Sequence, residues 1–157
     1  MNSIRIAIRG HTRITVRDHH GNIRLRRINP NIIVDGFLAF LAGVLSGDEA
    51  VPTDMKYIAI GESDDPPEGP AQVALEDEVM REEGAPSRVT SEDGVANDTY
   101  KVTATFMAGE ALTIVEAGLF DDDSAGTMAC RQTFSAVELK ATDELEVEWF
   151  ITFGRGA

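Results

Sequence analysis

Three consecutive aspartates, Asp121, Asp122 and Asp123, are the residues whose type and spacing first suggest chemistry. Clustered carboxylates are the ligands that Ca²⁺ prefers, so a calcium loop is one interpretation. The ligand spacing of an EF-hand and its distal bidentate glutamate are missing, and the following Ser124 and Gly126 are typical of turns. We therefore expect a solvated turn between two strands.

Histidine and cysteine are the other residue types that bind metals or perform nucleophilic catalysis. His11, His19 and His20 lie near the start of the chain, but His19 and His20 are neighbours in a predicted turn and cannot easily face one ion. Cys130 is the only cysteine, which excludes an internal disulfide and a cysteine-rich zinc site. Its apolar neighbours predict an inert, buried strand residue rather than a nucleophile.

Enzyme motifs are absent from the sequence. It has no glycine-rich phosphate loop, no nucleophile elbow and no zinc-hydrolase helix. We expect no catalytic residue, no metal site and no cofactor, and interpret the chain as a protein that is not an enzyme.

Two charged residues stand among apolar neighbours. Counting in twos places Glu116 on the face of Ile114, and Arg131 lies in the adjoining predicted strand. A buried charge without a partner costs several kcal/mol, about 3–5, so inward-facing charges need each other. We predict an internal polar network of Glu116 and Arg131 with Glu78 or Arg81; the alternative is exposure at a sheet edge.

Hydrophobic periodicity predicts a mainly β fold, an antiparallel sandwich or a jelly-roll-like barrel. Residues 4–9, 14–16 and 23–25 alternate with period two and predict an N-terminal β-meander, with its turn at Gly21. The clearest strands lie between residues 100 and 153, where Trp149 alternates with polar residues and points inward.

Two helices interrupt this pattern. One is predicted by an apolar stripe at helical spacing, with Asp35 as the N-cap and Gly47 as the terminator, and we expect this helix to be buried on most sides. The stripe consists of Phe37, Leu38, Leu41, Val44 and Leu45. Residues 74–81 predict a short second helix. Residues 62–70 and 82–98 are expected to be loops.

The charge of the chain is strongly polarised. It has 27 acidic and 14 basic residues, a net charge of -13. Residues 1–30 contain one acid and seven arginines, a net +6, which leaves -19 for residues 31–157. The arginines are Arg5, Arg9, Arg13, Arg17, Arg24, Arg26 and Arg27.

This polarity predicts two parts, a basic β-hairpin arm over residues 1–30 and an acidic β domain with an embedded helix over residues 31–157. The seven arginines are our candidate protein interface; the alternative is that they occupy the wet face of a hairpin. If the arm is separate, its deletion should leave the body folded. The net charge disfavours nucleic acid as a partner, no apolar run is long enough for a membrane span, and the acidic excess resembles proteins of salt-loving microbes.

A succession of short segments carries a resemblance to a known class. They are Gly21 after a basic strand and residues 31–36, 57–61, 75–81, 116–120, 128–134 and 145–153. In this order they resemble small virion proteins of tailed phages and archaeal tailed viruses, which serve as head decoration proteins or as tail-fibre and baseplate components. The resemblance implies a β-rich subunit that assembles as a symmetric oligomer, often a homotrimer, and binds the particle through an N-terminal arm.

Three functions follow as hypotheses. The first is a capsid decoration or cement protein that binds the major capsid protein or other virion proteins, and is thus located in the virion after assembly in the host cytoplasm. The second is a tail-fibre or baseplate component that uses the loops at 62–70 and 82–98 for host attachment. The third is a sugar-binding module, which the inward-facing Trp149 disfavours.

Overall fold

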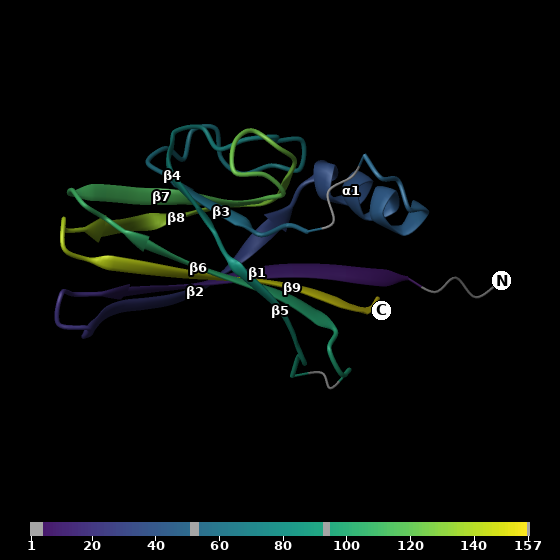
Figure 1. The fold of residues 1–157 in the computed structure, drawn as a ribbon, viewed down its shortest axis with the longest axis horizontal. Coiled ribbons are helices and arrows are strands. Elements are labelled where there is room, and N and C mark those ends of the chain that lie inside the picture. The colour runs from purple at the N-terminus through teal and green to yellow at the C-terminus, as the bar shows by residue number, and fades with distance from the viewer. Residues whose placement is uncertain (1–4, 51–53, 93–94, 157) are drawn as a thin grey trace.

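The computed structural model describes residues 5–50, 54–92 and 95–156, and its elements are drawn in Figure 1. In chain order they are β1 (Ile6–Arg17), β2 (Ile23–Ile33), α1 (Asp35–Ser46), β3 (Tyr57–Gly61), β4 (Glu78–Glu83), β5 (Ala85–Val89), β6 (Thr99–Met107), β7 (Leu112–Phe120), β8 (Met128–Leu139) and β9 (Glu144–Arg155). All paired strands are antiparallel. The predicted mainly β, antiparallel fold is confirmed.

The strands form one curled sheet in the order β4-β3-β7-β8-β2-β1-β9-β6-β5. Its two edge strands, β4 and β5, are separated in the chain by Gly84 alone, so the chain passes from one edge to the other within one residue. A Cβ at Gly84 would lie 2.4 Å from a methyl group of Val102, which explains why glycine stands at this corner. The sheet is therefore nearly closed, like a barrel.

The main core fills the inside of this sheet. Trp149, Phe106, Ile14 and Ile60 have at most 1% exposure and belong to one apolar cluster. A second, smaller cluster lies on the opposite face of β3, β7 and β8, where Leu75 packs with Ala59, Phe120 and Met128. Figure 1 shows the loop between β3 and β4 lying over this part of the sheet. The inside is thus packed, and the loop covers a second apolar layer.

The N-terminal hairpin is an integral part of the sheet. β1 pairs with β2 and, over its whole length from Ile6 to Arg17, also with β9. The predicted turn is confirmed, with Gly21 at φ 82°. The expected separation of an arm over residues 1–30 from a body over 31–157 is wrong for the described residues 5–30, because backbone bonds and the buried side chains Ile14 and Val16 join them to the core.

The predicted meander is a two-stranded hairpin rather than three short strands. Gly10 lies within the continuous strand β1 and is paired on both sides. The side chain of Asn31 occupies the space that a Cβ would need there. β2 also continues through Pro30 to Ile33. A proline is tolerated there because β2 is bonded to β8 only at Ile32 and Ile33, so that Pro30 lies where β2 is locally an edge.

Helix α1 is correctly predicted in its range and in its end at Gly47, but not in its burial. Only Phe37 of its twelve residues is buried. The N-cap is Val34 without a side-chain cap, and Asp35 is the first helical residue. The helix lies on one end of the sheet instead of inside it (Figure 1), and its outer side has no neighbour among the described residues.

Two further predictions are wrong. Residues 74–81 do not form a helix: Leu75 is buried in the smaller core and residues 78–83 pair with β3, whose hydrogen bonds override the local helical spacing. Part of the expected loop 82–98 is β5, which pairs with β6 over its five residues. In both places a partner strand distant in sequence decided the structure.

Candidate functional site: an apolar groove and the charged surface around it

Arg13 on β1 binds within the chain. Its Nη2 donates to Glu148 Oε1 over 2.7 Å, and Lys101 Nζ lies 2.9 Å from the same oxygen. The hydrogen bond from Arg13, together with Lys101, holds the pKa of the Glu148 carboxyl at about 2. Arg13 and Lys101 also lie over the ring of Phe150. This cluster spans β1, β9 and β6 and ties the three strands together.

Two other arginines bridge β2 and β8 where these strands have no backbone ladder. We name this region, between residues 23–31 and 132–139, the seam. Arg27 donates to Ser135 O over 2.6 Å, and Arg24 donates to Glu138 O over 3.2 Å and binds the Asp143 carboxylate. These guanidinium groups replace backbone bonds and hold the barrel closed.

The remaining candidate interface arginines lie at the surface. Arg17 is 3.6 Å from Glu146, Arg26 donates to Thr15 over 3.4 Å, and Arg5 and Arg9 are exposed. Five of the seven predicted interface residues thus have side chains that contact groups of their own chain, and the weakest of these contacts is the 3.4 Å bond of Arg26. Their part in binding another protein stays a prediction, and Arg5, Arg9 and Arg26 have the most freedom to act so.

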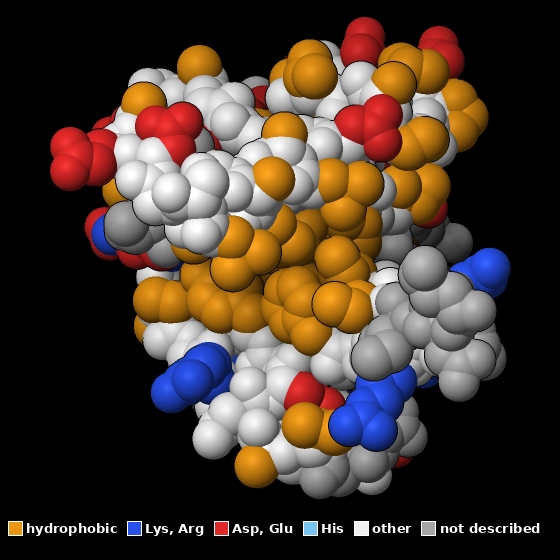
Figure 2. Space-filling model, turned by 90° about the vertical axis from the view of Figure 1, so that its right-hand side faces the viewer, with side chains coloured by type: hydrophobic (Ala, Val, Ile, Leu, Met, Phe, Trp, Pro, Cys, Tyr) orange, Lys and Arg blue, Asp and Glu red, His pale blue; other side chains and the backbone are white. Residues whose placement is uncertain are grey.

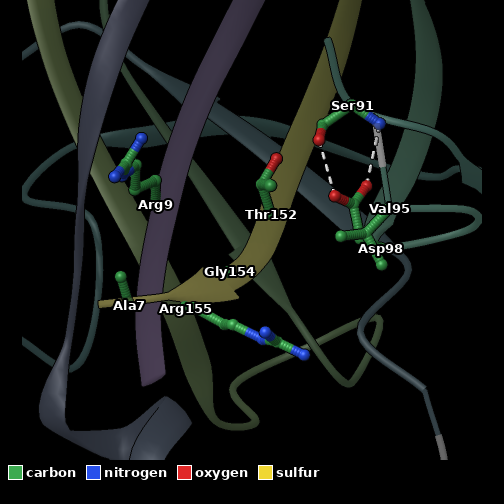
Figure 3. Close-up of a pocket in the computed structure, with 8 residues that line it drawn as sticks. All are labelled: Ala7, Arg9, Ser91, Val95, Asp98, Thr152, Gly154 and Arg155. Carbon is green, nitrogen blue, oxygen red and sulfur yellow. Dashed lines mark hydrogen bonds between the residues drawn. The ribbon is translucent and has the colours of Figure 1, made fainter. Parts of the chain in front are cut away.

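A hollow of about 500 Å³ lies beside Arg9 on the outer face of β1 and β9. Figure 3 shows Arg9 and Arg155 pointing in different directions, while Ser91 and Asp98 bond to each other. The Ser91 hydroxyl and amide lower the pKa of the Asp98 carboxyl. Because the two guanidinium groups do not converge and the carboxylate already has partners, this hollow lacks a formed anion site.

The predicted pair of Glu116 and Arg131 is buried and bonded. Arg131 Nε lies 3.0 Å from Glu116 Oε2, and both side chains have 0% exposure. Glu116 also accepts from the amides of Glu76 and Asp77, while Arg131 donates to Pro66 O. The pair therefore fastens the loop between β3 and β4 onto the sheet.

The face predicted for Glu116 is wrong. A bulge between Ile114 and Glu116 shifts the alternation, so Ile114 and Ala117 point into the main core and Glu116 points to the opposite face. Glu78 and Arg81 form a separate pair at 2.6 Å. Arg81 stacks on Phe120 and donates to the turn at Asp122. No bond joins these two pairs among the described residues.

Candidate metal and nucleophile residues have structural roles. Asp121 Oδ1 accepts from the Thr127 amide, and Asp122 Oδ1 from the Ser124 amide, as in a capped turn. Within the described ranges no three metal-binding side chains are grouped to hold an ion. Burial raises the pKa of the Cys130 thiol to about 12. None of the helices described is long and apolar enough to cross a membrane.

An apolar groove of about 280 Å³ lies between α1 and the end of the sheet. Its walls are Phe37, Phe40, Leu41 and Val44 of α1, Asp54 and Met55, and Pro86, Tyr100 and Phe153 of β5, β6 and β9. The Tyr100 hydroxyl donates to Met55 O, and burial raises the pKa of that phenol to about 12. Tyr100 therefore presents its ring, rather than a charge, to the groove.

Further apolar side chains surround the groove. Leu45 is 87% exposed, Leu38 53% and Val44 42%. Figure 2 shows an apolar band across this end of the molecule, with acidic side chains above it and mainly basic side chains below it. Sequence reasoning assigned this helical stripe to the core. The sequence of α1, which has no charge after Asp35, did not distinguish a buried helix from an exposed one.

No protein-family model, no curated protein and no solved structure matches this chain in the comparisons.

Proposed function

We propose that this chain is a non-enzymatic structural subunit of a tailed-virus particle, located in the virion, where it attaches to other proteins through the apolar groove and the exposed side of α1. The exposed apolar band carries the proposal. Large apolar patches on a protein surface mark interaction sites, and on the face drawn in Figure 2 this band is the broadest continuous apolar area. The resemblance of the sequence to small virion proteins supplies the viral context.

Within the particle we propose the role of a capsid decoration or cement protein that binds the major capsid protein or another virion protein. The fold suits a subunit that withstands mechanical force. Strand β1 is paired with β9 over its whole length, and Glu116 and Arg131 fasten the long β3–β4 loop. The subunit is proposed to act as an oligomer, with the homotrimer as the form that the resemblance implies.

A tail-fibre or baseplate component is the second candidate. Its specific support is the loop between β3 and β4, which stands at the surface with exposed Val73 and several exposed acidic residues. A sugar-binding role has less support, because Trp149 has 0% exposure and offers no indole platform for a sugar ring.

The copy number in purified particles separates the two virion roles. We expect quantitative mass spectrometry of gradient-purified particles to find this chain in numbers comparable to the major capsid protein. A few copies for each particle would instead support the tail role, and absence from the particles would reject both.

The groove is tested by adding purified protein to particles that lack it. Leu45→Asp should abolish attachment, since it places a charge on the apolar band. Val73→Asp is the matched control, because Val73 is also exposed, at 77%, but lies on the β3–β4 loop. Equal loss in both variants would contradict the proposed site.

A further inference from the structure

Helix α1 has the composition of a covered helix and the exposure of an uncovered one. Its twelve residues contain a single charge, Asp35, at the first position. A helix that is apolar on all sides normally lies within a protein or an interface. Here one residue is buried, while Leu38 and Leu45 are exposed. Some surface therefore covers α1 when the protein works.

The charges on the two sides of the apolar band are opposite. Figure 2 shows acidic side chains above it. Exposed Asp48 and Glu49 follow closely on the end of α1, whose residues form one wall of the groove. Below it lie the ends of β5 and β9. On β5, Arg88 lies two residues beyond the groove residue Pro86 and is paired with the groove residue Tyr100. On β9, Arg155 lies two residues beyond Phe153, where it also lines the hollow of about 500 Å³. Both arginines are exposed. The band is thus flanked by carboxylates on one side and by guanidinium groups on the other.

We propose that a second copy of this chain covers the groove, in a pair related by a two-fold axis that lies along the apolar band. Such an axis brings the acidic side of one copy over the basic side of the other, twice in each pair. The proposal rests on the proposed use of the groove as an attachment face. It assigns this face to a second copy in the free protein, in place of the homotrimer that the resemblance implies, and a virion protein takes the place of that copy on attachment.

The apolar band also contains both a projecting side chain and a hollow, which a contact between two identical copies needs. Leu45 projects from α1, and the groove between α1 and Tyr100 is a hollow of about 280 Å³ next to it. In a two-fold contact each copy contributes the projecting side chain and the hollow that receives it. The chain as a whole carries a charge of -13, which repels other copies, so contact is favoured at a face where opposite charges meet.

The test uses two charge-reversed variants of the full chain. One reverses the acidic side with Asp48→Lys and Glu49→Lys, and the other reverses the basic side with Arg88→Glu and Arg155→Glu. Masses are measured by light scattering after size exclusion, and folding of each variant is checked by near-ultraviolet circular dichroism.

We expect a mass of two chains for the wild type and of one chain for each variant alone. An equimolar mixture of the variants should again give two chains, because the basic face of one then meets the acidic face of the other. Leu45→Asp should give one chain and Val73→Asp two chains.

A wild-type mass of one chain at all concentrations would overturn the proposal. So would a mixture that stays at one chain, or a mass of three chains, which would favour the trimer. These results remain distinct from those for the proposed function. A single chain that still attaches to particles through Leu45 rejects the pair alone, and a stable pair that is absent from particles rejects the virion role alone.

Discussion

Arg131 Nε donates to Glu116 Oε2 over 3.0 Å in a site from which both side chains are fully excluded from solvent. The two residues lie on neighbouring strands, β8 and β7, and each has a second contact with the β3–β4 loop. The β3–β4 loop is thus held in place by a charged pair that is excluded from water.

Removal of one member of this pair should be strongly destabilising. Glu116→Gln leaves the Arg131 charge buried without a counter-charge, and we expect the free energy of unfolding to fall by about 3–5 kcal/mol. Urea unfolding followed by tryptophan fluorescence measures this. Glu78→Gln, which removes the more exposed pair with Arg81, is the control and should cost about 0–1 kcal/mol. Equal effects of the two substitutions would contradict the difference in burial.

The stability of the protein should fall at acid pH through Glu148. Its pKa is about 2 in the folded chain, against an ordinary value of 4.5, because Arg13 and Lys101 stabilise the charged form. The depressed pKa contributes stability that is fully present above about pH 4.5 and is lost as the pH falls towards 2. We therefore expect Glu148→Gln to have a lower melting temperature than the wild type at neutral pH. The two melting temperatures should converge as the pH falls from 4.5 to 2. A difference that stays constant down to pH 2 would show that Glu148 does not titrate in this way.

Deletion of residues 1–30 should abolish the folded state. The deletion removes β1 from its place between β2 and β9 and takes Ile14 and Val16 from the core. We expect near-ultraviolet circular dichroism and dispersed amide NMR signals to be lost. Arg5→Ser with Arg9→Ser is the control, which removes two exposed charges of the same segment and should leave both spectra unchanged. A folded deletion variant would restore the interpretation of this segment as a separate arm.

Cys130 should be inert towards thiol reagents in the folded protein. The thiol is fully buried, its pKa is raised to about 12, and the side chains of Asn31 and Trp149 lie against it. We expect no reaction with an aromatic disulfide reagent in native buffer and one equivalent in concentrated urea. Native reaction at the rate of the unfolded chain would mean that this part of the core opens easily.

The seam between β2 and β8 should exchange its amide hydrogens faster than the neighbouring ladders. Backbone pairing there is limited to Ile32 and Ile33, while Arg24 and Arg27 provide the other links. Arg27→Met removes the hydrogen bond to Ser135 O and should speed amide exchange in the part of β2 around residue 27. The exchange rates in β6 should stay unchanged. Hydrogen exchange followed by mass spectrometry measures both segments in one experiment.

Local alternation was sufficient to predict the strands and their inward faces where the pattern was regular. Leu145, Val147 and Trp149 are buried as their spacing indicated. The same counting failed at Glu116, because a single bulge residue, Val115, reverses the faces that follow it. A bulge leaves no clear mark in a single sequence, so the partnership with Arg131 was predictable and its face was not.

Long-range pairing explains the other differences. The arginines of β1 and β2 were interpreted as an arm because charge was counted along the chain, whereas Arg13 and Arg24 meet carboxylates that are more than a hundred residues away. For α1 the apolar stripe was recognised, but a stripe has the same composition whether its own chain or another surface covers it. The exposure of this stripe could therefore not be predicted, although the helix itself was.

The ladder between β1 and β9 joins two strands that lie far apart in the sequence, from Ile6 with Arg155 to Arg17 with Glu144. During synthesis β1 emerges long before β9 has been made. Its apolar residues Ile14 and Val16, which are buried in the folded chain, stay exposed to solvent in the meantime. Closure of the barrel therefore cannot precede the synthesis of β9. A chain truncated near its C-terminus would lack β9 and would leave the edges of β1 and β6 open to other nascent chains.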